Sequence, residues 1–169
     1  LTSPLQFDHL GARNANGVLE FLPHVGNINS NVLVHSEVDF VGTRGYVVFT
    51  NRADVDIRYA EFDGLGRTKA EECLDSTIFD EMGAVLYIGS NHIGRYAFHF
   101  HHVRGPATTP ANGFQATLIG NVVNGSPKWG IVVHNTHFAL VQGNVVSEAA
   151  GAGIMLEDGS ESENIIEQN

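Results

Sequence analysis

The chain has 169 residues, a formal net charge of −10 at pH 7 and 43% apolar residues, which is enough apolar material for one domain with a buried core. No lysine or arginine follows Lys128, which argues against a nucleic-acid partner, because phosphate binding requires clustered basic residues. The sequence has no run of about 18 apolar residues to insert into a membrane, and its single cysteine, Cys73, cannot form an internal disulfide.

Short β-branched runs set off by Gly, Asn or Ser recur along the chain and predict short strands rather than helices. The unit at 54–62 alternates polar and apolar residues, so an antiparallel hairpin is an alternative there. In chain order, the predicted units are 17–21, 31–34, 45–49, 54–62, 84–88, 96–102, 120–123, 130–135, 143–146, 153–158 and 163–166.

The units near the C-terminus repeat. Gly-Asn-Val-Val occurs at 120–123 and again at 143–146, and the runs at 130–135 and 153–158 have the same spacing of 23 (153 − 130). A period in the low twenties is typical of a solenoid, and strands this short and closely spaced favour a parallel β-helix. We therefore predict an all-β fold, a single parallel β-helix domain over residues 1–169, with about seven coils.

Two segments interrupt the repeat, at about 64–82 and 104–112, and are predicted to be loop insertions. A shortened third copy of the repeat, Glu-Asn-Ile-Ile, lies at 163–166, so the chain stops in what reads as another rung. We expect it to be part of a longer protein. Asn121, Asn144 and Asn164 precede equivalent apolar pairs, which predicts a ladder of stacked asparagines at one corner.

Aligning the strands at 97–102, 130–135 and 153–158 separates two faces, because side chains alternate along a strand. One face is apolar and is predicted to be the core. The other carries His101, His134 and Glu157 on successive rungs, with His99 on the same face and Asp158 at the adjoining turn. Rungs lie about 4.8 Å apart, so these groups should perturb one another's pKa values, which is a mark of functional sites.

Two chemistries suit this column. In the first, His101, His134, Glu157 and Asp158 act as acid and base in hydrolysis or elimination of a bound polymer. In the second, His99, His101 and His134 bind a divalent metal, with Glu157 or Asp158 as a further ligand. The metal is either calcium or a transition metal such as zinc. The residues alone leave both open.

Residues 93–101, Ile-Gly-Arg-Tyr-Ala-Phe-His-Phe-His, resemble the "LGRYPIHFH" segment of the extracellular parallel β-helix family that includes fibrocystin and the cell-migration-inducing hyaluronidases. Val-Val-His-Asn at 132–135 resembles the family's "VTVHG" rung, and Leu-Glu-Asp-Gly at 156–159 its "LEDG" rung. The resemblance is best over 93–169. It implies a right-handed β-helix, a secreted or cell-surface setting, and glycan binding or hyaluronan depolymerisation, although several members have no known activity.

By position, the resemblance transfers His99, His101, His134, Glu157 and Asp158, with Arg95 and Tyr96 beside them. Arg95 is a candidate clamp for an acidic sugar or a structural arginine paired with a loop acid. Tyr96, His99 and Trp129 complete the predicted substrate-binding set, the two aromatic rings as surfaces for sugar stacking.

Ala97 stands where the family usually has proline, Asn135 where it has glycine, and a glycine-rich domain that precedes the helix in larger members is absent from this sequence. The resemblance and the outward column of His101, His134 and Glu157 give the first hypothesis, a carbohydrate-active β-helix that binds or depolymerises an extracellular polysaccharide. The alternative is a non-catalytic surface-protein module that binds a metal or a glycan without chemistry.

Overall fold

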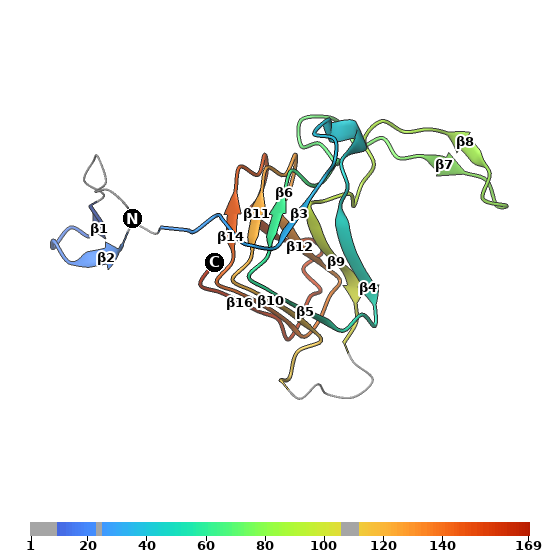
Figure 1. Cartoon of the computed structure of the whole chain (residues 1–169). Helices are drawn as coiled ribbons and strands as arrows, with labels where there is room; N and C mark the ends of the chain where they lie inside the picture. The colour runs from blue at the N-terminus through green and yellow to red at the C-terminus, as the bar shows by residue number, and fades with distance from the viewer. Residues whose placement is uncertain (1–9, 23–24, 106–111) are drawn as a thin grey trace.

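The computed structural model describes residues 10–22, 25–105 and 112–169. Within them the chain forms short strands and one 3-10 turn, Val41–Thr43, with no α-helix. Twelve strands stack into three parallel sheets of four, which is a parallel β-helix (Figure 1). No helix in the described part is long and apolar enough to cross a membrane.

The chain visits the three sheets in turn. The first sheet contains β3 (Leu33–His35), β6 (Glu61–Asp63), β11 (Val122–Asn124) and β14 (Val145–Ser147). The second contains β4 (Val47–Asn51), β9 (Phe98–Val103), β12 (Ile131–His134) and β15 (Ile154–Leu156). The third contains β5 (Val55–Arg58), β10 (Ala116–Ile119), β13 (Ala139–Gln142) and β16 (Ile165–Glu167).

The core lies between the three sheets and is built from the inward side chain of every second strand residue. Phe98 and Phe100 of β9, Leu118 of β10 and Val133 of β12 are all 0% exposed. The rings of Phe98 and Phe100 meet edge to face at 5.1 Å. Leu156, predicted to be in the core, is 44% exposed because β15 is the last strand of its sheet.

Two predicted rungs are instead parts of antiparallel hairpins. The unit at 17–21 contains β2 (Leu19–Phe21), which pairs with β1 (Ala12–Arg13). The unit at 84–88 contains β8 (Val85–Tyr87), which pairs with β7 (Ile78–Phe79) in a hairpin that projects from the stack (Figure 1). Short apolar runs such as Ala-Val-Leu-Tyr-Ile at 84–88 fit both kinds of pairing, so the sequence did not separate them.

The predicted count of about seven coils is not confirmed, since each parallel sheet has four strands. The unit at 54–62 is not a hairpin: β5 and β6 belong to different parallel sheets. The predicted loop at 64–82 contains β7, and residues 106–111 of the one predicted at 104–112 lie outside the described residues. The right-handed winding implied by the family resemblance stays a prediction.

The predicted asparagine ladder forms, but Asn169 takes the place of Asn164 in it. Asn121 donates from its side chain and backbone amide to Asn144 Oδ1, and Asn144 Nδ2 donates to Asn169 Oδ1. Asn164, the predicted third member, lies elsewhere and accepts from the Ala139 amide. The prediction aligned 163–166 with 143–146, whereas Ile165 and Ile166 pair with Leu140 and Val141 of β13, and Asn144 meets Asn169.

Candidate functional site

The predicted column lies on β9, β12 and the end of β15, which are neighbours in one parallel sheet. His101 of β9 stands directly opposite His134 of β12, and the Glu157 amide donates to the Val133 carbonyl at 3.1 Å. This register brings His101, His134 and Glu157 together although they lie far apart in sequence.

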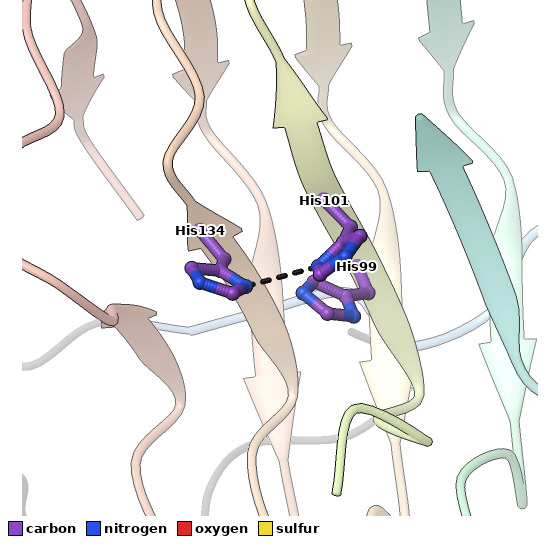
Figure 2. A group of neighbouring side chains, drawn as sticks. All are labelled: His99, His101 and His134. Atoms are coloured by element: carbon purple, nitrogen blue, oxygen red, sulfur yellow. Dashed lines mark hydrogen bonds between the residues drawn. The ribbon is translucent and has the colours of Figure 1, made fainter. Parts of the chain in front are cut away.

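Three imidazole rings cluster on this face (Figure 2). His101 Nδ1 and His134 Nδ1 are 2.9 Å apart, and the rings of His99 and His134 are stacked with centroids 5.8 Å apart. One ring nitrogen from each of the three residues lies within 4.8 Å of the other two. A fourth imidazole, His102, stacks on His101 at 4.1 Å.

His99 is on the outward face of β9 but is 1% exposed, because the segment before the strand covers it. Its Nδ1 is 3.1 Å from the Gly94 carbonyl, while its Nε2 is buried and has no hydrogen-bond partner among the residues that the structure describes. Burial lowers the pKa of His99 to about 4, and burial also lowers the pKa of His101. Both rings are therefore neutral at pH 7.

Two carboxylates approach His134 from different sides. Asp158 Oδ2 is 2.9 Å from His134 Nε2, and Glu157 Oε2 is 3.6 Å from His134 Nδ1. Glu157 Oε1 accepts a hydrogen bond from the Tyr96 hydroxyl at 3.1 Å, whereas Oε2 is buried without a partner. Burial and the charge of Glu157 raise the pKa of Tyr96, so its phenol stays protonated and donates.

The predicted substrate-binding residues Arg95, Tyr96 and Trp129 make internal contacts. The Arg95 guanidinium lies 4.9 Å over the Tyr46 ring and bonds to its hydroxyl, rather than pairing with a loop acid. Tyr96 is 1% exposed, and its ring packs 4.8 Å from the half-buried Trp129. Lys128 covers Trp129, with Nζ 4.4 Å from the ring.

A pocket of about 380 Å³ opens over the histidines. Its lining includes Tyr46, Arg95, His99, His101 and Glu157. A larger pocket of about 770 Å³, over the coil corners near Tyr59 and Asn144, contains no histidine or carboxylate side chain. The titratable groups therefore identify the smaller pocket as the candidate site.

Sequence reasoning missed the residues that hold this pocket in shape. Thr68, which is 0% exposed, donates to the His92 carbonyl at 2.6 Å and accepts from the Arg95 amide at 2.9 Å. Asn91, 1% exposed, accepts from the Lys69 amide at 2.8 Å. These bonds fix the segment that carries Arg95 and Tyr96. No repeat or motif marks Thr68, Asn91 or Tyr46.

Residues 79–169, more than half of the chain, match the CEMIP beta-helix family. Fibrocystin-L of Mus musculus is 24% identical over 200 residues and aligns with all of this chain, and Fibrocystin-L of Homo sapiens is 30% identical over 77 residues, or 46% of the chain. The chain spans only 4% and 2% of the length of these two relatives. No solved structure gives a significant match.

Proposed function

The chain belongs to the CEMIP beta-helix family, the extracellular parallel β-helix family that includes fibrocystin and the cell-migration-inducing hyaluronidases, and on that premise we propose that it binds an extracellular polysaccharide and depolymerises it. The observation that carries the proposal is the pair of carboxylates, Glu157 and Asp158, on either side of His134 beside a pocket.

His134 is the proton acceptor in this proposal. The Asp158 carboxylate accepts from Nε2–H at 2.9 Å, which fixes the tautomer and leaves Nδ1 with a lone pair that faces His101 Nδ1 at 2.9 Å and that must be released from His101 when substrate binds. A base oriented by an acid on its second nitrogen is the recurring arrangement for activating a nucleophile. In hydrolysis, Nδ1 takes a proton from water as the water oxygen bonds to the anomeric carbon; in elimination, it takes the proton from a sugar carbon.

Glu157 is the second proton-transfer group: in its protonated form it gives its proton to the glycosidic oxygen as the bond to the anomeric carbon breaks, and it is left as the carboxylate. Its Oε1 is held by the Tyr96 hydroxyl, and its Oε2 is not hydrogen-bonded. His101, 2.9 Å from His134 across the two strands, completes the site centre, and His99 assists from the buried side.

The rim of the pocket favours an acidic sugar. Arg95 lines it, and Arg67 lies nearby with its guanidinium 5.1 Å from the Tyr46 ring. A guanidinium that is not neutralised by a carboxylate is a suitable partner for a uronate. A glycan substrate of this kind agrees with a secreted or cell-surface location, which we propose together with the activity.

The test is depolymerisation of a panel of acidic and neutral polysaccharides, hyaluronan included, followed by size analysis of the products. We expect turnover by the wild type and by His35→Ala, whose target is exposed on β3, and none by His134→Ala or Glu157→Gln with unchanged circular dichroism. Turnover retained in His134→Ala would overturn the assigned role of His134.

A non-catalytic glycan-binding or metal-binding module is the second candidate. It is favoured by the internal contacts of Arg95 with Tyr46 and of Tyr96 with Trp129, which occupy side chains predicted to bind substrate. Polysaccharide that protects the protein against thermal unfolding without any product would support this candidate and reject the enzyme.

A further inference from the structure

The hydrogen-bond partners of the three clustered histidines assign a tautomer to two of them. A carbonyl oxygen only accepts, so His99 donates from Nδ1 to Gly94 and its Nε2 carries a lone pair. A carboxylate likewise accepts, so His134 donates from Nε2 to Asp158 and its Nδ1 carries a lone pair. His99 and His134 therefore each present one unprotonated nitrogen.

His99 Nε2 is the strongest sign that something is missing from the cluster. A polar atom this well buried normally has a hydrogen-bond partner, and each exception requires an explanation. Glu157 Oε2, 3.6 Å from His134 Nδ1, is also buried without a hydrogen-bond partner. One cation held by the three imidazoles would satisfy His99 Nε2 and would lie on the side of His134 Nδ1 that Glu157 Oε2 approaches.

We propose that His99, His101 and His134, with Glu157 as a fourth ligand, form a binding site for a divalent transition metal ion of the zinc type. Nitrogen and carboxylate donors in this number suit zinc, whereas calcium takes six to eight oxygen ligands. The backbone carbonyl of Gly94 and the carboxylate of Asp158 orient the ligands from behind, as such partners do in zinc sites.

The distances between the ring nitrogens allow a zinc site if the three rings draw together. Bonds of 2.0–2.1 Å in a tetrahedral zinc site place ligand nitrogens about 3.3 Å apart. The 2.9 Å between His101 Nδ1 and His134 Nδ1 is close to that value, whereas the outer limit of 4.8 Å for the three rings requires them to draw together by up to about 1.5 Å. The ion replaces the proton that His101 and His134 share without it.

This inference rests on the proposed function and deepens it, since it concerns the same pocket. Its test measures zinc binding, whereas the test of the proposed function measures turnover. With the ion bound, His134 Nδ1 is a ligand, and a water that displaced Glu157 from the fourth position would have its pKa lowered by the metal. Arg95 and Tyr46, which contact each other at the rim, are not ligands of the ion.

The experiment is calorimetric titration of chelator-stripped, tag-free protein with Zn²⁺ alone and, separately, with Ca²⁺ alone. We expect about one Zn²⁺ per chain and no heat from Ca²⁺ at this site. The His99→Gln and His134→Gln variants should lose the binding, Asp158→Asn should weaken it about 10- to 100-fold, and His35→Gln, the matched control, should bind as the wild type does.

Asp158→Asn and His134→Gln change half-buried or exposed positions, so they keep the test valid if His99→Gln does not fold. Wild-type protein that binds no Zn²⁺, or variants that all bind it equally, would overturn the proposal. Zinc bound without cleavage of any polysaccharide would uphold the metal site and reject the enzyme. Cleavage that persists in chelator, with no zinc taken up, would do the reverse.

Discussion

At the scale of single residues, the site depends on side chains that are buried yet polar. Glu157 is the clearest case: its side chain is 15% exposed, and of its two oxygens only Oε1 has a hydrogen bond, from Tyr96. A buried carboxylate is costly unless it is hydrogen-bonded or paired. The Tyr96 hydroxyl is therefore part of what permits a carboxylate beside His134.

We expect Tyr96→Phe to lower the free energy of unfolding by about 1.5–3 kcal/mol, the range for a hydrogen bond to a charged group. Urea unfolding at pH 7 measures this loss. Tyr59→Phe is the matched control, because the ring of Tyr59 is 65% exposed. Equal losses in both variants would contradict the role given to the Tyr96 hydroxyl.

Asp75 anchors the base of the β7–β8 hairpin and should confer a pH dependence on it. Its carboxylate accepts from the Ser90 amide at 2.9 Å and from the Tyr87 hydroxyl at 2.8 Å. These bonds lower the pKa of Asp75 below its ordinary value of 3.8. Its contribution to folding is thus complete above pH 3.8 and is lost as the pH falls through the lower folded-state pKa.

An NMR titration of the Asp75 carboxyl carbon tests this anchor. We expect a midpoint below 3.8 in the wild type, and a higher midpoint in Tyr87→Phe, which lacks one of the three donors, since the Ser90 hydroxyl also donates to Asp75. Tyr59→Phe should leave the midpoint unchanged. A midpoint unaffected by Tyr87→Phe would show that the phenol does not hold the carboxylate.

At the scale of elements, the coil corners determine how the strands stack. Gly120 and Gly143 occupy equivalent corners with φ of 65° and 63°, the left-handed region that glycine adopts without strain. The next residues, Asn121 and Asn144, then turn inward and bond from coil to coil. Each such bond satisfies backbone groups that the corner leaves without a strand partner.

Asn144→Ala should therefore cost about 1–3 kcal/mol in the free energy of unfolding, because it leaves the Asn121 amide without its acceptor in a buried place. Asn124→Ala, at a half-buried position of β11, should cost less than half as much. Urea unfolding of the two variants tests the comparison, and a reversed order would show that the ladder adds little.

The sequence predicts these elements where the repeat is regular and fails where it is not. The spacing of 23 holds between Asn121 and Asn144, and it correctly placed β11 beside β14 and β12 beside β15. The next coil has 25 residues, and Asn-Ile-Ile at 164–166 belongs to β16 beside β13, although its similarity to 144–146 had placed it beside β14. A repeat seen in sequence does not reveal the coil at which its length changes.

Some residues of the site were predictable from the sequence and others were not. His101, His134 and Glu157 were predictable, because strand register alone brings them together. Tyr46 was not, since it meets Arg95 across 49 residues and an insertion whose path the sequence does not specify. The near-complete burial of His99 was missed for the same reason, since the segment that covers it follows that insertion.

At the scale of the whole molecule, the three sheets share one core, so stability should depend on position along the stack. Leu118 of β10 is 0% exposed between two neighbouring strands, whereas Leu156 of β15 is 44% exposed at the end of its sheet. A continuous core transmits the loss of an inner side chain to the entire fold.

We expect Leu118→Ala to cost about 2–5 kcal/mol in the free energy of unfolding, as large-to-small core substitutions do. Leu156→Ala, the matched control, should cost less than about 1 kcal/mol, because its side chain is already half in solvent. Equal costs, measured by urea unfolding, would contradict a core that is continuous through the stack.

The proposed metal ion should couple to this global unfolding, because its three histidine ligands lie on two adjacent strands, β9 and β12, and come apart when the stack opens. An ion that binds only the folded chain, at a free concentration of 100 times its Kd, adds about 2.7 kcal/mol to the free energy of unfolding. We therefore expect zinc to raise the Tm of the wild type and of His35→Gln, a chelator to reverse the rise, and His134→Gln to show none. A rise in Tm of equal size in His134→Gln would mean that zinc stabilises the protein at another place, since that variant lacks only one ligand and keeps the rest of the β-helix sequence.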